Sequence, residues 1–356
     1  MKFSANSLVR ENIRKLEKYA SARDEFSGKA KIYLDANENT AGSAARKKMN
    51  RYPDPLQKQV RKKIAEHKNI DTPEKIFLGN GSDEAIDILV RAFCEPRTDS
   101  LMIMPPSYGM YRVCAEINDV NILYVPLKKD FSLDVPQVIQ KARKVKPKLI
   151  FICSPNNPSG KSFQAENIEA ILRNTQSLVL LDEAYIDFSD KVSWNQRINE
   201  FPNLVVLQTF SKAWGMAGVR MGMAFAGREI IEIMNKIKYP YNISDLTAAA
   251  ILKALQDEKR KVNMVLQIKK ERGELIRALK SIPLVKEILP TDANFFLARF
   301  EDAKAVYRYL KSRGIIVRDR SDQLHCEGCL RITVGTHREN KILVNELKEY
   351  SEKVNT

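Results

Sequence analysis

Short apolar runs alternate with helical patterns along most of the chain. From about Lys75 onward, each β-branched run leads into a turn rich in Gly, Pro, Asn or Ser, and a helical pattern follows the turn. Several runs are apolar at every position, which is typical of strands that helices cover on both faces. The pattern therefore predicts an α/β sheet. We expect its strands over residues 75–78, 101–104, 122–125, 149–153, 178–181, 204–208 and 223–226.

A second, smaller unit is predicted after about Asp245. A long helical pattern covers residues 246–281, and Pro283 ends it. The predicted domains are an N-terminal arm over 1–40, a large domain over 41–245, and a small C-terminal α/β domain over 246–356 that part of the arm completes. In the small domain we expect strands over 294–299, 315–317 and 330–334, a helix over 302–313 and a final helix from Arg338.

Composition changes this picture little. The 356 residues are 44% hydrophobic and 29% charged, which are ordinary values for a folded protein. The first residues contain no apolar run of the kind found in signal peptides, and no later run reaches the ~18 residues of a membrane helix. We therefore expect a cytoplasmic protein without a membrane partner. The five cysteines lie mostly within apolar runs and are expected to be buried free thiols.

The formal net charge of +15 raises the alternative of a nucleic-acid-binding protein. The basic runs at 61–63, 259–261 and 269–272 have the pattern of solvated helix faces. No helix-turn-helix, zinc-finger or aromatic-interleaved basic strand accompanies them. We therefore expect no nucleic-acid partner, and we expect the positive field to attract small anionic substrates.

A pair of cysteines raises the alternative of a metal site. Cys326 and Cys329 form a C-x-x-C pair beside His325. A zinc site needs four ligands at suitable spacing, and only His67 and His337 remain as histidines. We therefore expect no metal, and we interpret the pair as part of a connecting loop.

Polar residues gather where the predicted strands end, which is where ligands bind in open α/β sheets. The separations from Asn157 to Asp182 and from Asp182 to Lys212 each fit one strand–helix–strand crossover. The spacing therefore predicts that these three side chains meet at one edge of the sheet. The polar segments are Ser-Pro-Asn-Asn-Pro-Ser-Gly at 154–160, Asp-Glu-Ala-Tyr at 182–185, Thr-Phe-Ser-Lys at 209–212 and Gly-Asn-Gly-Ser-Asp-Glu at 79–84.

Each of these segments also has an ordinary structural explanation. The Gly-Asn-Gly segment can be a turn with a helix cap, Asp182 can cap a helix or bind Mg²⁺, and Lys212 can be a surface lysine. Together, however, the segments supply what pyridoxal phosphate needs from a protein. They offer an anion site for the phosphate, a carboxylate for the ring nitrogen, donors for the ring oxygen and an amine for the aldehyde.

The chain also resembles a known enzyme family over nearly its whole length. With the segments above, its motifs are similar to those of the histidinol-phosphate aminotransferases, which are fold type I enzymes that use pyridoxal phosphate. The resemblance implies a large domain with a mostly parallel mixed sheet flanked by helices, and a smaller C-terminal α/β domain. Thr40 stands where many relatives have Pro. The further motifs are Tyr-Ala-Ser-Ala-Arg at 19–23, Leu-Asp-Ala-Asn-Glu at 34–38, Asn-Arg-Tyr-Pro at 50–53, Pro-Pro-Ser-Tyr-Gly-Met-Tyr at 105–111 and Cys-Leu-Arg-Ile-Thr-Val-Gly-Thr at 329–336.

The resemblance implies a role for each residue of a cofactor site. Lys212 would carry pyridoxal phosphate as a Schiff base and then act as general base and acid, while Asp182 would pair with the pyridinium nitrogen. Tyr185 and Asn157 would hydrogen-bond the phenolic oxygen, and Tyr108 would stack on the ring. For the phosphate, the resemblance implies Gly81, Ser82, Asp83, Ser211 and Arg220.

The resemblance also implies the substrates and the oligomeric state. Arg331 matches a carboxylate-binding arginine suited to glutamate, and Tyr19, Arg318 and Arg331 match positions that bind the phosphate of histidinol phosphate. Asn37 matches a position near the substrate. Tyr52 matches a residue that reaches the phosphate in the neighbouring subunit, which implies a homodimer with shared active sites. The implied reaction is transamination between L-histidinol phosphate and 2-oxoglutarate in histidine biosynthesis.

Alternatives remain open from the sequence. Arg318 and Arg331 can be exposed arginines of a basic protein, Tyr108 a packed aromatic, and Tyr52 a loop anchor. Threonine-phosphate decarboxylases and aromatic or broad-range aminotransferases share the cofactor residues. A catalytically silent relative that senses a ligand is disfavoured, because Lys212 and its expected partners are all retained.

Overall fold

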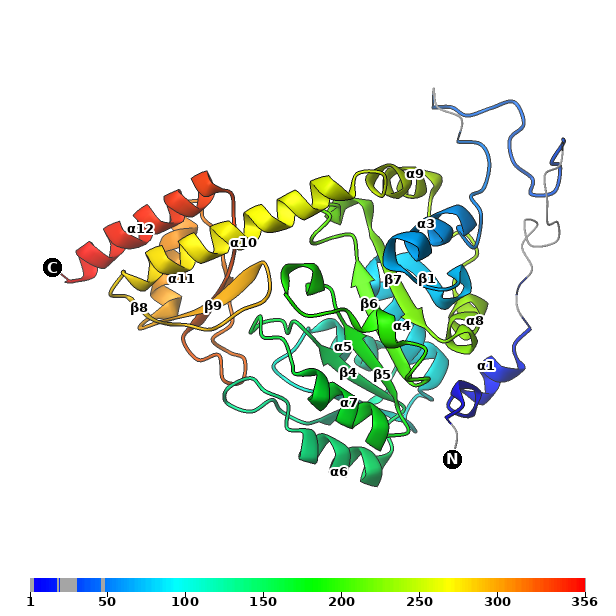
Figure 1. Ribbon diagram of the computed structural model, residues 1–356, viewed down its shortest axis with the longest axis horizontal. Coiled ribbons are helices and arrows are strands. Elements are labelled where there is room, and N and C mark those ends of the chain that lie inside the picture. Colours follow the sequence, from blue (N-terminus) through cyan, green and yellow to red (C-terminus); the bar gives the residue numbers. More distant parts are fainter. Residues whose placement is uncertain (1–2, 18, 20–30, 46–48, 356) are drawn as a thin grey trace.

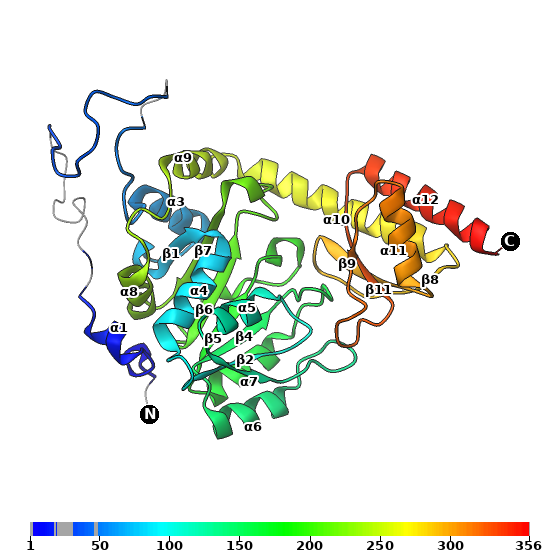
Figure 2. The same ribbon diagram turned by 180° about the vertical axis from the view of Figure 1, so that it is seen from behind.

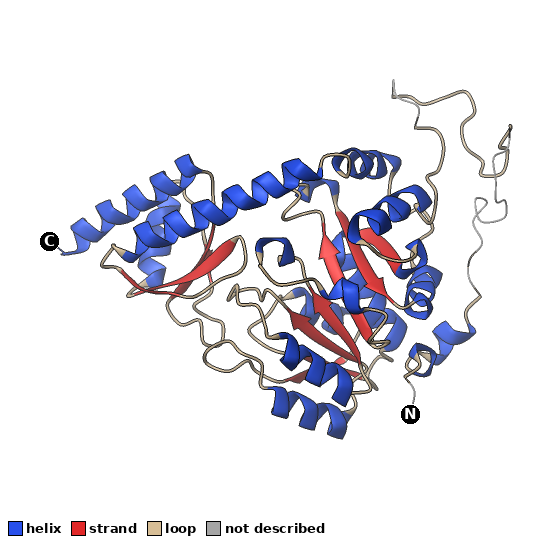
Figure 3. Ribbon diagram, in the orientation of Figure 1, coloured by secondary structure: helices blue, strands red, loops and turns tan. Residues whose placement is uncertain are grey.

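The chain folds around two β-sheets of unequal size, which lie apart along the long axis of the molecule (Figure 1). The computed structural model describes residues 3–17, 19, 31–45 and 49–355. Residues 20–30, in the predicted N-terminal arm, lie outside the described residues. Helices and strands alternate along most of the described chain (Figure 3), so the predicted α/β class is confirmed.

The larger sheet contains seven strands in the order β1-β7-β6-β5-β4-β2-β3. The strands from β6 to β3 run parallel, whereas β7 is antiparallel to both of its neighbours, β1 and β6. Each strand predicted for this domain is present with bounds close to those expected. The strands are β1 (Ile76–Asn80), β2 (Ser100–Ile103), β3 (Asn121–Tyr124), β4 (Leu149–Cys153), β5 (Leu178–Asp182), β6 (Leu204–Thr209) and β7 (Met221–Ala226).

Helices cover both faces of the larger sheet because alternate residues of each strand point to opposite sides. In β4, Leu149 and Phe151 pack with α4, α5 and α8, whereas Ile150 and Ile152 pack with α3, α6 and α7. Two apolar layers therefore sandwich the sheet. The helices are α3 (Lys58–Lys68), α4 (Gly81–Phe93), α5 (Met110–Ile117), α6 (Val135–Val145), α7 (Ala165–Asn174) and α8 (Arg228–Ile237), and the short α1 (Glu11–Lys15) precedes them.

The smaller sheet is antiparallel, in the order β10-β11-β9-β8. One of its faces packs against three helices, α10, α11 and α12, in a core of its own. In both views, α10 extends from the side of the larger sheet to the small sheet, where it packs beside α12 (Figures 1 and 2). The elements are β8 (Val285–Ile288), β9 (Phe295–Phe300), β10 (Arg318–Asp319), β11 (Cys329–Thr333), α10 (Glu258–Lys280), α11 (Ala303–Ser312) and α12 (His337–Asn355).

The long helix expected over 246–281 is two helices. The first, α9, covers Asp245–Ala254, and α10 begins at Glu258. Asp257 starts the second helix because its Oδ1 accepts a hydrogen bond from the backbone N–H of Arg260 at 3.1 Å. An apolar and basic periodicity continues through the break, which explains why the sequence predicted one element.

The strand predicted over 315–317 is wrong. The strand β10 contains only the next two residues. Ile315 and Val317 pack into the core of the small unit, so they alternate as a strand does without entering the hydrogen-bonded ladder. The edge strand β8, which is half exposed, was not predicted.

In two of the basic runs that the sequence predicted to be solvated helix faces, two residues are exposed and one is not. Arg61 is buried in α3, where its Nε donates to the carbonyl oxygen of Pro73 at 2.9 Å. In α10, Nζ of Lys261 lies 2.6 Å from Oδ1 of Asp187, and both side chains are mostly buried. This ion pair ties the start of α10 to the segment that follows β5.

The cysteines behave as their apolar neighbours predicted. All five are buried and free. Burial raises the pKa of Cys326 to about 12 and the pKa of Cys329 to about 11. The neighbouring His325 directs Nε2 to the carbonyl oxygen of Leu127 at 3.1 Å.

In the described part of the chain, no helix combines the length and the apolar character needed to cross a membrane.

Gly222 lets β7 and the start of α4 approach closely, and its replacement gives a test of this packing. A Cβ at Gly222 would lie 2.1 Å from the backbone N of Ser82 and 2.2 Å from the backbone C of Gly81. Gly222→Ala should therefore destabilise the protein by on the order of 1–3 kcal/mol. Gly273→Ala is the control, because it adds a methyl group within α10 without a close contact and should stabilise by roughly 0.5–1 kcal/mol.

Urea unfolding followed by tryptophan fluorescence measures both changes. The unfolding midpoint should fall for Gly222→Ala and rise for Gly273→Ala. Similar midpoints for Gly222→Ala and the unsubstituted protein would contradict the close approach.

Candidate active site

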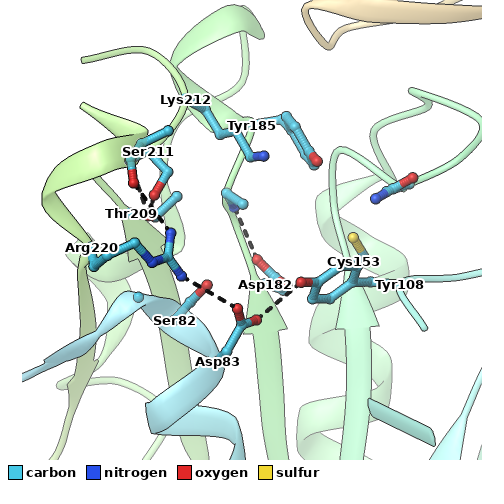
Figure 4. Close-up of a pocket in the computed structure, with 14 residues that line it drawn as sticks. Ser82, Asp83, Tyr108, Cys153, Asp182, Tyr185, Thr209, Ser211, Lys212 and Arg220 are labelled. Atoms are coloured by element: carbon cyan, nitrogen blue, oxygen red, sulfur yellow. Dashed lines mark hydrogen bonds and ion pairs between the residues drawn. The ribbon is translucent and has the colours of Figure 1, made fainter. Parts of the chain in front are cut away.

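A pocket opens at the carboxyl ends of β4, β5 and β6 (Figure 4). Its empty volume is about 630 Å³, including the part that opens to solvent. Every residue expected to contact the cofactor lines it except Tyr52. The lining residues are Gly81, Ser82, Asp83, Tyr108, Cys153, Asn157, Asp182, Ala184, Tyr185, Thr209, Ser211, Lys212, Ala217 and Arg220.

Three neighbouring parallel strands bring these residues together. Cys153 at the end of β4 pairs with Asp182 at the end of β5, and β6 lies on the other side of β5. The segments that follow the three strands place Asn157, Asp182 and Lys212 in one pocket. A helix, α7, connects β4 to β5 as expected, whereas β5 and β6 are connected only by loop and two short 3-10 turns, Ile186–Phe188 and Trp194–Arg197.

The carboxylate of Asp182 lies at the floor of the pocket, and only 3% of the residue is exposed. Its Oδ2 accepts a hydrogen bond from the hydroxyl of Tyr111 at 2.6 Å, and its Oδ1 accepts one from the backbone N–H of Ala184 at 3.0 Å. Burial raises the pKa of Asp182, and these hydrogen bonds offset only part of the rise. A cation beside the carboxylate would stabilise its charged form, so the floor suits a protonated ring nitrogen.

The start of α4 forms an anion site on one wall. The backbone N–H of Gly81 donates to the carbonyl oxygen of Arg220 at 3.1 Å, and the side chain of Asn80 makes no capping hydrogen bond to the N–H groups that follow. These later N–H groups, at the start of a helix that lines the pocket, therefore suit an anion. Gly81 has a φ of 75°, and a Cβ there would lie 2.8 Å from Nη2 of Arg220. Nη2 of Arg220 lies 3.8 Å from Oδ2 of Asp83, whose Oδ1 accepts a hydrogen bond from the hydroxyl of Tyr108 at 3.0 Å. Figure 4 shows this chain of contacts beside Ser82.

The amine of Lys212 lies 5.6 Å from the ring centroid of Tyr185. The lysine side chain is accessible from the pocket mouth, yet the walls partly desolvate its ammonium group and lower its pKa. The positive charge of Arg331 lowers this pKa further. A lowered pKa increases the fraction of neutral amine, which is the nucleophilic form.

Two residues of the small sheet contact side chains that line the pocket. Phe295, the first residue of β9, packs edge-on against Tyr185 with ring centroids 4.9 Å apart. From β11, Nη1 of Arg331 donates to Oδ1 of Asn157 at 2.5 Å. Arg318, the other arginine expected at the substrate, pairs with Arg331 in the β10–β11 ladder, and its side chain is exposed.

Three of the expected residues lie away from this pocket. Tyr52 is 51% exposed and stacks on Tyr241 with ring centroids 4.5 Å apart. Tyr19 is 71% exposed, and Asn37 is also exposed, with a φ of 54°. Figure 1 shows residues 31–45 lying away from the larger sheet, on the side opposite the small sheet. Within one chain, therefore, these residues do not line the pocket.

Sequence reasoning assigned no role to Tyr111, Thr209 or Phe295. Tyr111 lies in the first turn of α5 and packs edge-on against Tyr108, with ring centroids 5.6 Å apart. Thr209 ends β6, and its Oγ1 accepts a hydrogen bond from the backbone N–H of Ser211 at 3.1 Å. The strand-end rule had already placed Thr209 in the polar segment 209–212, and only its contact with Ser211 was not predicted. Phe295 comes from the other sheet, and no local signal indicates it.

The pocket combines an anion site, a buried carboxylate and an amine with a lowered pKa. A simple anion would use the first of these and leave Asp182 without a cation. Pyridoxal phosphate fits all three, because it has a phosphate, a basic ring nitrogen and an aldehyde. The buried carboxylate is therefore the feature that favours this cofactor over a plain phosphate ligand.

Comparison with known proteins agrees with this geometry. The sequence matches the family Aminotransferase class I and II over residues 22–347. It is 52% identical to a histidinol-phosphate aminotransferase of Cytophaga hutchinsonii over 98% of this chain and 100% of that protein.

The fold is also similar to solved structures. One is the histidinol-phosphate aminotransferase from Sinorhizobium meliloti in complex with pyridoxal-5'-phosphate, with a TM-score of 0.79, 24% identity, and coverage of 86% of this chain and 84% of that chain. Another is the L-threonine-O-3-phosphate decarboxylase from Porphyromonas gingivalis, with a TM-score of 0.73 and 24% identity. The match covers 85% of this chain and 91% of that chain. The predicted fold type I architecture is confirmed. The chain therefore belongs to the histidinol-phosphate aminotransferase family of the class I and II aminotransferases.

Proposed function

We propose that this protein catalyses transamination between L-histidinol phosphate and 2-oxoglutarate, which gives imidazole-acetol phosphate and L-glutamate in histidine biosynthesis. The observation that carries the proposal is one pocket lined by an anion site, a buried carboxylate and Lys212, with Arg331 bonded to the lining residue Asn157. The first three suit the cofactor, and the arginine adds a site for an anionic substrate. The 52% identity to a histidinol-phosphate aminotransferase over 98% of the chain supports the choice of substrate.

The cofactor is pyridoxal phosphate, which supplies an electron-withdrawing ring when it is bound. Asp182 would hold the protonated ring nitrogen, and this contact would compensate for the desolvation of its carboxylate. Ser82, Ser211 and the N–H groups at the start of α4 would hold the phosphate. Arg220 now lies beside Asp83, and it would turn to the phosphate dianion, which is the stronger partner.

The remaining contacts would orient the ring. Asn157 and Tyr185 are buried in the wall and would donate hydrogen bonds to the ring oxygen. Tyr108 would cover one face of the ring. Phe295 packs against Tyr185 from the small sheet, so a movement of this sheet would also move the ring contacts.

Lys212 would have two tasks. Its Nζ would hold the cofactor, and once released it would take the proton from Cα of the substrate and deliver it to C4′ of the cofactor. Attack on the aldehyde and removal of the Cα proton both need the neutral amine. Desolvation and the nearby charge of Arg331 lower the pKa of Lys212 and so favour that form.

Arg331 and Arg318 would bind the anionic end of both substrates in turn. Glutamate presents a carboxylate, and histidinol phosphate presents a phosphate in place of the carboxylate that amino acids carry. Arginine suits both groups because its guanidinium offers paired N–H donors. Arg331 is already fixed by Asn157, so its donor geometry is set before the substrate arrives.

We also infer a homodimer in which the arm of one subunit serves the active site of the other. Ile32 and Leu34 are 74% and 81% exposed, which is unfavourable for apolar side chains in a lone chain. Tyr52 and the arm residues Tyr19 and Asn37 do not line the pocket of their own chain. In the dimer, Tyr52 would contact the phosphate of the partner's cofactor, and Tyr19 and Asn37 would contact the substrate. A cytoplasmic location stays a prediction from the sequence.

Substrate comparison tests the proposed reaction. With 2-oxoglutarate as acceptor, kcat/KM for histidinol phosphate should exceed that for phenylalanine by at least about 100-fold, because a site built for a phosphate rejects substrates that lack it. Glutamate formation measures both rates. Release of carbon dioxide from threonine phosphate, measured in parallel, should be undetectable. Faster decarboxylation than transamination would instead assign the protein to the decarboxylases of this fold.

Borohydride reduction tests the role of Lys212. Reduction of the cofactor-loaded protein should fix the cofactor on Lys212, and peptide mass spectrometry should find it there. Lys212→Ala should lower kcat by at least about 10³-fold, because the residue that moves the proton is lost. Lys253→Ala, which removes an exposed lysine of α9, is the control and should leave kcat unchanged. Cofactor fixed on any other lysine would exclude this assignment.

Mixing two inactive variants tests the exchange of Tyr52 between subunits. Tyr52→Ala and Lys212→Ala should each be nearly inactive. After unfolding and refolding together, about half the dimers are mixed, and each mixed dimer has one site with both residues intact, so about a quarter of the normal activity should return. If Tyr52 acts within its own chain, no activity will return in the mixture.

A further inference from the structure

The small sheet presents three arginines on one face. Arg331 in β11 pairs with Arg318 in β10, and paired residues of neighbouring strands project to the same side. Arg320 follows Arg318 by two positions, and its backbone N–H donates to the carbonyl oxygen of Cys329 at 3.0 Å, which continues the ladder. Because side chains alternate along a strand, Arg320 projects to the same side as the other two arginines.

This face looks toward the pocket. The opposite face carries Leu330 and Ile332, which are buried in the apolar core of the small unit. Arg331 lies between them and points the other way, toward Asn157. Burial raises the pKa of Tyr185, and the charges of Arg331 and Arg320 oppose this rise. Both guanidinium groups therefore lie close to the pocket wall that Tyr185 forms.

Arg320 lacks the partners that such a cation usually has. Its Nε is buried and makes no hydrogen bond to any residue that the structure describes. Burial lowers the pKa of Arg320, and the charges of Arg331 and Arg318 lower it further, while Asp322 opposes the shift without forming an ion pair. Arg318, Arg320 and Arg331 thus lie together on this face. Among the described residues, their guanidinium groups have one hydrogen-bond acceptor, the amide oxygen of Asn157.

We propose that Arg320 is a third anion-binding residue of the substrate site and that it makes the site select a phosphate monoester dianion over a carboxylate. The inference rests on the proposed function and deepens it. One arginine satisfies the two oxygens of a carboxylate in a bidentate contact. A phosphate monoester has three terminal oxygens and nearly two negative charges at neutral pH, so it can accept hydrogen bonds from three guanidinium groups and balance their repulsion.

Kinetics of Arg320→Gln test the assignment in the holoenzyme. For histidinol phosphate, KM should rise and kcat/KM should fall about 10- to 100-fold, which corresponds to the loss of one charge-assisted hydrogen bond, while kcat changes little. For glutamate, kcat/KM should change less than about threefold, because its carboxylate is held by Arg331. Arg320→Lys keeps the charge but loses the planar donors. Its kcat/KM for histidinol phosphate should therefore lie between that of the unsubstituted protein and that of Arg320→Gln.

Arg308→Gln is the control for the loss of one positive charge, because Arg308 is exposed on α11, on the far side of the small sheet. Its kinetics should match those of the unsubstituted protein, and the cofactor absorbance of Arg320→Gln should also be normal. If the unsubstituted protein turns over histidinol phosphate and Arg320→Gln retains kcat/KM within about twofold, the inference fails and the proposed function stands. Equal losses for glutamate and histidinol phosphate would likewise overturn the selective role. Absence of histidinol phosphate turnover in the unsubstituted protein would instead refute the proposed function.

Discussion

The buried charge of Asp182 is the constraint on which the pocket depends. The carboxylate ends a central strand, is almost fully desolvated, and receives hydrogen bonds from Tyr111 and from the backbone N–H of Ala184. A buried charge with so few partners costs on the order of several kcal/mol unless a cation compensates for it. The protonated ring of pyridoxal phosphate is such a cation. A ring held at Asp182 would have the anion site at the start of α4 available for its phosphate. The amine of Lys212 would be available for its aldehyde.

Much of this arrangement could be predicted from the sequence, because it follows from backbone geometry. Apolar runs locate the strands of the larger sheet, and parallel neighbours place their carboxyl ends at one edge. The polar residues after β4, β5 and β6 therefore had to meet, and Asn157, Asp182 and Lys212 do line one pocket. Periodicity was less informative in the small unit, where Ile315 and Val317 alternate like a strand but are held by core packing alone.

What the sequence could not give depends on contacts between distant elements. Tyr111 and Phe295 support the pocket from a helix and from the other sheet, and neither stands in a chemical motif. Arg320 looks like one more cation in a basic chain until the register of β10 and β11 places it beside Arg331. The role proposed for Tyr52 was implied by resemblance alone, because it rests on contacts between two proposed subunits rather than on a local pattern.

Thermal unfolding of the unsubstituted protein and of Asp182→Asn, each with and without pyridoxal phosphate, tests the central claim most directly. Burial raises the pKa of Asp182 above its unfolded value, so the ionised group destabilises the cofactor-free protein at pH values above that unfolded pKa. The account predicts that Asp182→Asn without cofactor unfolds at the same or a higher temperature, and that added pyridoxal phosphate stabilises it far less than it stabilises the unsubstituted protein. A variant that is less stable without cofactor, yet gains as much from pyridoxal phosphate, would contradict the account.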